Sequence, residues 1–145
     1  MATFLMTWNP VRLPIDEVEW DDMVDRTAKG EEVEARWTTG VAKKLLRRGD
    51  DGFFLRQTKD RGIVGTCRFL SEVYEDDHWA IEGKTANYAD LVWTRWVPIE
   101  DRLPVETLIR EIPEIVWNNI VGSGYRVPDE VEARLWDLWD DHIGA

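Results

Sequence analysis

Short β-prone segments cluster in the middle of this chain, and segments with helical periodicity lie toward its margins. Apolar and β-branched residues gather between turn residues in the segments that are expected to form strands, namely 3–7, 32–37, 52–57, 62–70 and 87–98. Residues 58–61 are short enough to join the third and fourth of these strands as a hairpin. The core of this hairpin is expected to contain Phe53, Leu55, Ile63, Val64 and Phe69.

Two longer segments have the spacing of apolar residues that an amphipathic helix requires. Residues 15–30 place apolar side chains on one side, and residues from Pro128 onward carry the stripe Val131, Leu135, Leu138 and Trp139. Shorter elements are expected as a helix over 41–47 capped by Thr39, a helix over 105–112, and a strand or 3₁₀ turn over 115–120. The sequence therefore predicts a single α+β domain over residues 1–145, with a small mixed β-sheet or open barrel flanked by helices.

Composition excludes several classes of protein. Hydrophobic residues make up 43% of the 145 residues, which is enough for a folded core. The apolar runs are only a few residues long, and the first residues lack a basic start, so neither a membrane span nor a signal peptide is expected. The single cysteine, Cys67, permits no disulfide within the chain and favours a cytoplasmic location.

Charge is unevenly distributed along the chain. The net charge is −11, which argues against general adhesion to nucleic acid. Residues 29–68 nevertheless hold 10 basic and 6 acidic residues, whereas residues 69–145 hold 6 basic and 17 acidic ones. A local positive field in an acidic protein suits selective binding to a phosphate-bearing ligand.

The positive block contains the segment Arg36-Trp37-Thr38-Thr39-Gly40. An aromatic face, two hydroxyl groups and nearby basic residues suit a flat polar ring attached to phosphates, which describes a nucleobase. The basic residues that are candidates for phosphate contacts are Lys43, Lys44, Arg47, Arg56 and Arg61. A tryptophan in a strand also commonly packs into the core, so this alternative for Trp37 stays open.

Tryptophan occurs nine times, and three of these residues lie beside polar residues at expected strand ends or in loops. If the fold brings Trp8, Trp37 and Trp79 together, they form an aromatic cage in which stacking contributes about 1–3 kcal/mol per base. Asp76 or Asp77, in the long polar connection 71–86, would accept a hydrogen bond from a cytosine amino group. The alternative is three tryptophans that pack separately.

Catalytic and metal-binding patterns are weak. The acidic runs at 21–22, 75–77 and 140–141 are typical of solvated surface, and Cys67 lies in an apolar run where a buried, unreactive thiol is expected. Two histidines give no recognisable metal-ligand spacing, and no phosphate-binding GxxxxGK loop is present in the sequence. We therefore expect no enzymatic activity, no metal and no cofactor.

Five segments resemble those of the EVE domains of the PUA-like superfamily and, more distantly, of YTH domains. They are FLMTWNP, EARWTTGVAKKL, GDDGFFLRQTKDRGIVGTCRF, YEDDHWAIEGKTANYADLVW and PEIVWNNIVGSGYRVPDEVEARLWDLW, which together span nearly the whole chain. The order and spacing look most like the EVE branch that is found beside HNH nucleases in bacterial modification-dependent restriction. No HNH motif follows in this sequence, so the resemblance implies either a separate nuclease partner or a reader that works alone.

The resemblance implies a non-catalytic reader that binds a modified base, flipped out of its strand, in an aromatic pocket. Trp37 and Trp79 match the two cage tryptophans, Thr38 takes the place of a serine that faces the base, and Trp8 with Asn9 falls at the polar end of the first strand. Ala42 stands where the pattern often has asparagine. The expected ligand is 5-methylcytosine or 5-hydroxymethylcytosine in DNA. The alternatives are a modified RNA base, a protein-interaction domain without a nucleic-acid ligand, and a carboxylate-dependent hydrolase.

Overall fold

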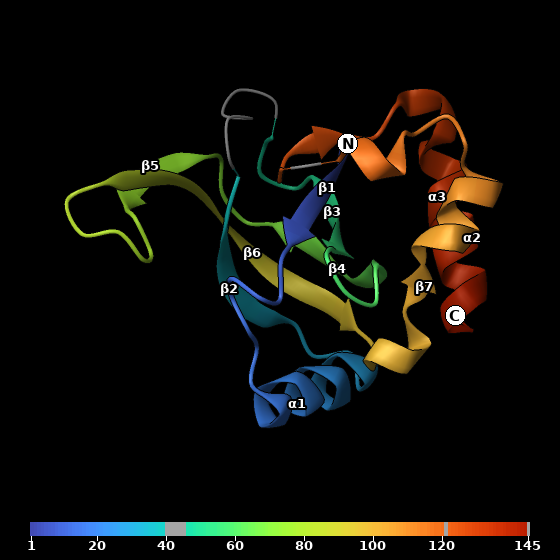
Figure 1. Cartoon of the computed structure of the whole chain (residues 1–145), viewed down its shortest axis with the longest axis horizontal. Coiled ribbons are helices and arrows are strands. Elements are labelled where there is room, and N and C mark those ends of the chain that lie inside the picture. The colour runs from blue at the N-terminus through green and yellow to red at the C-terminus, as the bar shows by residue number, and fades with distance from the viewer. Residues whose placement is uncertain (40–45, 121, 145) are drawn as a thin grey trace.

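A mixed β-sheet forms the centre of the protein (Figure 1). The computed structural model describes residues 1–39, 46–120 and 122–144. The strands in these ranges are β1 (Thr3–Trp8), β2 (Val33–Thr38), β3 (Asp51–Arg56), β4 (Gly62–Phe69), β5 (Tyr74–Asp77), β6 (Thr85–Trp96), β7 (Leu103–Pro104) and β8 (Tyr125–Arg126). They are accompanied by the helices α1 (Glu17–Ala28), α2 (Val105–Glu111) and α3 (Asp129–Ile143) and by two 3₁₀ turns, η1 (Ile99–Asp101) and η2 (Trp117–Asn119).

The strand order in the sheet is β2-β6-β4-β3-β1-β8, with β5 paired to β6 and β7 paired to β4. Only the pair β1–β3 is parallel among the described strands, and the sheet that they form is not closed. The predicted α+β class, with a small mixed sheet flanked by helices, is confirmed. None of the described helices is long and apolar enough to cross a membrane.

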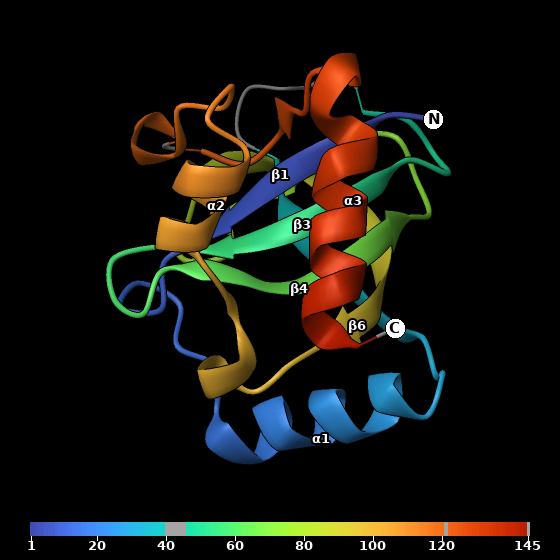
Figure 2. The ribbon, with the colours of Figure 1, turned by 90° about the vertical axis from the view of Figure 1, so that its right-hand side faces the viewer.

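Alternating side chains of the central strands bury both faces of the sheet. Leu5, Phe53 and Ile63 face a core that α2, η2 and α3 complete, whereas their neighbours Phe54 and Val64 face a second core under α1. This alternation follows from the two-residue period of a strand. Figure 2 shows α3 lying across β1, β3 and β4, with α1 at a different side of the sheet. The five core residues that were expected in the hairpin are all buried.

Helix α1 is held to β6 by polar contacts as well as by packing. Asp16 caps the helix by accepting a hydrogen bond from the Val18 backbone N–H at 2.8 Å. Trp20 donates from Nε1 to the Val97 carbonyl at 3.1 Å, and Thr27 Oγ1 accepts from the Trp96 backbone N–H at 2.9 Å. Because these bonds fix the helix against the sheet, they also fix the tryptophan-rich core beneath it.

The predicted long loop over 71–86 is wrong for part of its length. Residues 74–77 form β5, which pairs antiparallel with the start of β6 in register Tyr74 to Tyr88. The tyrosine rings of this pair lie 6.2 Å apart, and this cross-strand contact supports a strand in a segment whose composition is otherwise acidic. We call the resulting hairpin, residues 74–88, the β5–β6 arm, and it projects away from the rest of the sheet (Figure 1).

The other element predictions are met with small shifts in boundary. The segment 115–120 contains the 3₁₀ turn η2, and the last helix follows Pro128 as expected, ending at Gly144 with a φ of 77°. That φ lies in the left-handed region, which glycine adopts without strain. The short helix predicted over 41–47 falls largely outside the described residues.

Candidate functional site

A pocket of about 650 Å³ opens where β1, β2 and the β5–β6 arm meet. The segments that line it are far apart in the sequence, and β2 and the arm meet because β6 pairs with both β2 and β5. The lining residues are Thr7, Trp8, Asn9, Arg12, Leu13, Arg36, Trp37, Thr38, Gln57, His78, Trp79, Thr85, Ala86, Asn87, Tyr88, Gly122 and Ser123. This mixture of indole rings with hydroxyl and amide groups is typical of a site for a small, partly polar ligand.

Five of the seven residues that were expected to bind a base line this pocket, namely Trp8, Asn9, Trp37, Thr38 and Trp79. The other two, Asp76 and Asp77, are not among the lining residues. The fold thus brings together tryptophans from β1, from β2 and from the loop of the arm. All three border this one pocket, and Trp8 and Trp37 also pack against the core.

Trp37 belongs both to the pocket and to the core. Its Nε1 donates to the Thr7 carbonyl at 3.1 Å, and its ring meets Phe54 edge to face at a centroid distance of 5.2 Å. The indole is therefore held by β1 and β3 while part of it remains accessible at the pocket. Core packing and ligand contact, which the sequence presents as alternatives for Trp37, coexist in this position.

Trp8 forms a buried wall of the pocket. The residue is only 2% exposed, its Nε1 donates to the Leu13 carbonyl at 2.6 Å, and its ring packs 5.2 Å from the ring of Trp20. The Arg56 guanidinium lies 5.0 Å from the centre of the Trp8 ring. Trp8 is therefore fixed by neighbours and supplies shape rather than a freely exposed stacking face.

Arg56 lies inside the protein and not at the surface where phosphates would run. The residue is 7% exposed and donates from Nε to the Lys59 carbonyl at 2.8 Å. Burial lowers the pKa of its guanidinium. The structure thus gives Arg56 a contact with aromatic rings in place of the solvent-facing position that the sequence suggested.

Trp79 is the one exposed tryptophan among the nine, all of which the structure describes. It is 44% exposed and stacks on His78 at a centroid distance of 5.5 Å. His78 Nδ1 accepts hydrogen bonds from the backbone N–H groups of Ala80 and Ile81, each at 3.0 Å, and so orders the loop that carries the indole. Trp79 therefore presents a large aromatic surface to solvent beside the pocket.

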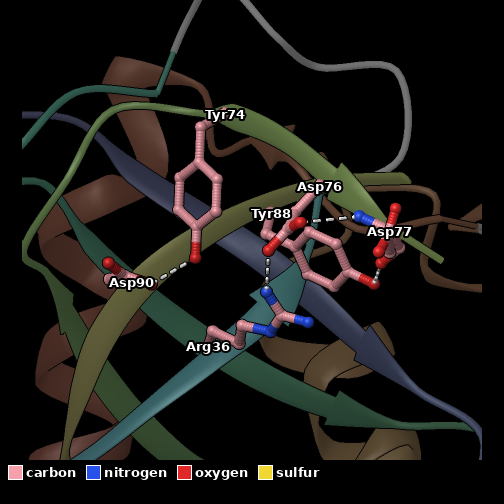
Figure 3. Close-up of polar contacts among 6 residues, drawn as sticks. All are labelled: Arg36, Tyr74, Asp76, Asp77, Tyr88 and Asp90. Atoms are coloured by element: carbon pink, nitrogen blue, oxygen red, sulfur yellow. Dashed lines mark hydrogen bonds and ion pairs between the residues drawn. The ribbon is translucent and has the colours of Figure 1, made fainter. Parts of the chain in front are cut away.

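Asp76 and Asp77 serve the arm itself. Asp76 Oδ2 accepts from Arg36 Nη1 at 2.9 Å, and the Asp77 carbonyl accepts from the Tyr88 hydroxyl at 2.7 Å (Figure 3). The pKa of the Asp76 carboxyl is lowered by a hydrogen bond from the Asp77 backbone N–H and by the Arg36 guanidinium. Asp76 was expected to contact a base and instead pairs with Arg36. The sequence did not reveal strand β5, and the pairing of this strand directs the Asp76 side chain toward Arg36.

The other candidates for phosphate contacts occupy varied positions. Lys43 and Lys44 lie outside the described residues. Arg47 is exposed and pairs with Glu72 at 3.6 Å, and Arg61 donates to Asn118 Oδ1 at 3.0 Å. Among the described residues, the basic side chains that line the pocket are Arg12 and Arg36, of which Arg36 directly precedes Trp37 in the sequence.

Several lining residues were missed from the sequence. Gln57 donates from its side chain to the Ile120 carbonyl, and Ser123 accepts at Oγ from the Thr7 backbone N–H at 2.9 Å. Tyr88 lies opposite Thr38 in the β2–β6 register, so it became visible only once that pairing was known. The flexible turn 122–124 was the available signal for Ser123, because small polar residues in such turns often lie at binding sites.

Reactive groups are scarce in the described part of the chain. No group of three or more His, Cys, Asp or Glu side chains is placed to hold a metal ion within residues 1–39, 46–120 and 122–144. Cys67 is fully enclosed on β4, and burial raises the pKa of its thiol, as expected for an unreactive cysteine.

Neither a family model nor a curated protein matches the sequence. Solved structures do match. A hypothetical protein from Leishmania major aligns with a TM-score of 0.66 and 18% identity over 97% of this chain and 96% of its own. Human THYN1 in complex with DNA containing 5-methylcytosine aligns with a TM-score of 0.61 and 16% identity, covering 95% of this chain and 97% of that one.

The Mmi1 YTH domain in complex with RNA also aligns, with a TM-score of 0.54 and 11% identity over 98% of this chain and 79% of its own. The chain has a PUA-like α+β fold. At these identities the likeness concerns the fold, and the PUA-like architecture that the sequence resemblance implied is confirmed. Within this PUA-like fold the lining of the pocket includes residues of the outer strand β2 and of the β5–β6 arm.

Proposed function

We propose that this protein is a non-catalytic reader that binds a modified nucleobase, flipped out of its strand, in the pocket between β2 and the β5–β6 arm. The ligand that we favour is 5-methylcytosine or 5-hydroxymethylcytosine in DNA. The observation that carries the proposal is the presence of Trp37 and Trp79, 42 positions apart in the sequence, in the lining of one pocket with Thr38. Support also comes from the shared fold of human THYN1 in complex with DNA that contains 5-methylcytosine.

The free energy needed to flip a base into this pocket is modest. Removing a base from its stack costs a few kcal/mol, and stacking on aromatic side chains returns about 1–3 kcal/mol per base. The exposed surface of Trp79 and the partly accessible ring of Trp37 are the groups that supply this stacking. Thr38, Gln57 and Ser123 place hydroxyl and amide groups in the same lining, where they can meet the polar edge of a base.

The pocket also offers an explanation for recognition of a methylated base. Leu13 and the indole of Trp8 contribute apolar surface to the lining. A methyl group gains free energy when it leaves water for such surface, at about 25 cal/mol per Å² of area buried. An unmodified cytosine would leave this part of the pocket without a partner group and would bind more weakly.

The proposal assigns binding and not turnover to this site. In the part of the chain that the structure describes, the lining contains no Asp, Glu or Cys, and Nδ1 of its one histidine, His78, accepts two backbone hydrogen bonds. A role in modification-dependent restriction would then require a separate nuclease as partner. This part of the proposal rests on the sequence resemblance alone.

The test is a titration followed by intrinsic tryptophan fluorescence at low salt. The probes are short duplexes that differ only in one cytosine, which is unmodified, methylated or hydroxymethylated, together with the matched methylated RNA strand. We expect quenching with a modified DNA duplex and a weaker response with the unmodified one. Selective binding of the RNA strand would replace DNA by RNA as the ligand, in line with the fold shared with the Mmi1 YTH domain in complex with RNA. No response to any probe would overturn the proposed function and favour a protein-interaction domain.

A further inference from the structure

The β5–β6 arm has little packing of its own. Residues 75–77 of β5 are exposed, and β5 pairs with β6 alone among the described strands. The loop at the end of the arm is closed by a hydrogen bond from the His78 backbone N–H to the Lys84 carbonyl at 2.8 Å. Because an isolated two-stranded ribbon is marginally stable, contacts with the rest of the sheet must set the direction of this arm.

Arg36 on β2 supplies such contacts across the intervening strand β6. Its guanidinium lies 4.0 Å from the centre of the Tyr88 ring on β6 and donates to Asp76 on β5 at 2.9 Å (Figure 3). The Tyr88 hydroxyl in turn donates to the Asp77 carbonyl at 2.7 Å. One side chain of β2 is thereby joined to both strands of the arm.

A further bond fixes the base of the arm. The Tyr74 hydroxyl donates to Asp90 Oδ1 at 2.5 Å, and Asp90 lies opposite Arg36 in the β2–β6 register. Figure 3 shows Arg36, Tyr74, Asp76, Tyr88 and Asp90 gathered over the crossing of the three strands. These residues share one face because each pair of neighbours in the ladder presents its side chains to the same side.

The contacts of Arg36 affect the pocket because each of the two strands that it joins, β2 and β5, is close in sequence to a tryptophan of the lining. Trp37 comes directly after Arg36 on β2 and is held by Thr7 and Phe54. Trp79 lies two positions beyond β5 and is held mainly by its stacking on His78. The distance between the two indoles therefore depends on the direction of the arm.

We infer that Arg36 is a positioning residue, which holds the β5–β6 arm against β2 through Asp76 and Tyr88 and so sets the separation of Trp79 from Trp37. The inference rests on the proposed function, because the separation of the indoles matters only if a base enters between them or against them. It assigns to Arg36 a role other than contact with a phosphate. The two roles predict opposite effects when the carboxylate of Asp76 is neutralised.

The test compares Asp76→Asn with Glu75→Gln. Both variants remove one negative charge from β5, so their effects on the general attraction of nucleic acid are equal. Of these two acidic residues, only Asp76 pairs with Arg36, since Glu75 makes no ion pair with any residue that the structure describes. We expect Asp76→Asn to bind a short duplex with one 5-methylcytosine about threefold to fivefold more weakly than Glu75→Gln does, as for the loss of an exposed ion pair. Equal binding by the two variants would overturn the inference, and tighter binding by Asp76→Asn would overturn it and assign Arg36 to the phosphates.

A second measurement needs no nucleic acid. Backbone amides of residues 74–88 should exchange with solvent faster in Asp76→Asn than in Glu75→Gln, while both variants keep the thermal midpoint of the wild type. A Trp79 signal from incorporated fluorotryptophan, assigned with Trp79→Phe, should shift only in Asp76→Asn. If neither readout distinguishes the variants, Arg36 does not hold the arm. If wild-type protein fails to distinguish methylated from unmodified duplex, the proposed function fails, and the exchange data still decide whether Arg36 holds the arm.

Discussion

At the scale of single residues, the tryptophans divide into those that build the core and those that face the pocket. Trp96 and Trp117 are fully enclosed, whereas Trp79 is 44% exposed. Trp37 lies between these extremes because its N–H is bonded within the protein while its ring borders the pocket. The residue that most directly links stability and binding is therefore Trp37.

Trp37→Phe and Trp136→Phe form a matched pair that separates these effects. Each indole is half-buried and donates one hydrogen bond, Trp37 to the Thr7 carbonyl and Trp136 to Thr3 Oγ1 at 3.0 Å. Each substitution should lower the free energy of unfolding by about 1–2 kcal/mol, because a hydrogen bond and part of a packed ring are lost. Urea denaturation measures this effect.

Only Trp37→Phe should also weaken binding of a methylated duplex, by about threefold to tenfold, because Trp136 lies on α3 away from the pocket. Dissociation constants for the two variants check this expectation. Equal affinities for the methylated duplex would mean that Trp37 serves the core alone.

Some of the site residues could be predicted from the sequence, and the contacts of others could not. Trp37 and Thr38 were predicted because an indole beside hydroxyl groups is recognisable without a structure, and Trp79 was predicted because it is an indole in a long polar segment. Arg56 was predicted to contact phosphates but is buried. Its sequence neighbours do not reveal that the rings of Trp8 and Trp20 lie within 6 Å of its guanidinium. Contacts of that kind arise from tertiary packing, and local pattern carries no information about them.

At the scale of elements, the pairing of β4 with β6 leaves no room for a side chain at Gly65. Gly65 lies opposite Trp96 in the ladder, and a methyl group on it would overlap the Trp96 ring and the Arg95 carbonyl oxygen. Because the carbonyl belongs to the backbone, the overlap cannot be relieved by a side-chain rotation. Gly65→Ala should therefore lower the free energy of unfolding by about 2–4 kcal/mol, as measured by urea denaturation. Gly122→Ala, where the added methyl group meets no atom of the described residues within 4 Å, should stay within about 0.5 kcal/mol of wild type.

Helix α3 is joined to the turn after α2 by an ion pair with a clear pH dependence. Arg134 donates to both carboxylate oxygens of Glu114, each at 2.7 Å, and lowers the pKa of that carboxyl to about 2. A carboxyl whose pKa is lowered in the folded state stabilises the fold above its unfolded pKa of about 4.3 and loses that contribution as the pH falls toward 2.

Glu114→Gln should therefore be less stable than wild type at pH 7, with a difference that shrinks between pH 5 and pH 2. Urea denaturation at several pH values measures it. Glu82→Gln, which removes an exposed carboxylate that forms no ion pair among the described residues, is the control. A constant difference between Glu114→Gln and wild type across this range would show that the ion pair does not contribute to stability.

The β5–β6 arm marks the limit of element prediction. Periodicity predicted β3, β4, β6 and α3 because their apolar residues repeat with the period of a buried strand or helix. The acidic strand β5 has no buried face, so no hydrophobic pattern marks it. It exists through backbone pairing with β6 and through side chains such as Arg36, whose participation depends on the register of β2.

At the scale of the whole molecule, the sheet has two cores and one functional edge. The face under α2 and α3 is filled by aliphatic residues with Phe53, Trp117 and Trp139, and the face under α1 holds a larger cluster of aromatic rings. The α+β class followed from the order of elements, but the parallel pairing of β1 with β3 and the meeting of β2 with the arm did not. Such long-range pairings bring the pocket residues together, and only the folded chain reveals them.

The central claim is that a modified base stacks on Trp79 in the pocket that Trp37 lines. The most direct test is the dissociation constant of Trp79→Ala for a duplex with one 5-methylcytosine, measured beside wild type and beside the unmodified duplex. Trp79 is exposed, so the variant should fold normally. We predict that wild type prefers the methylated duplex and that Trp79→Ala binds this duplex between about fivefold and a hundredfold more weakly than wild type does. Unchanged affinity of Trp79→Ala for the methylated duplex would contradict the central claim.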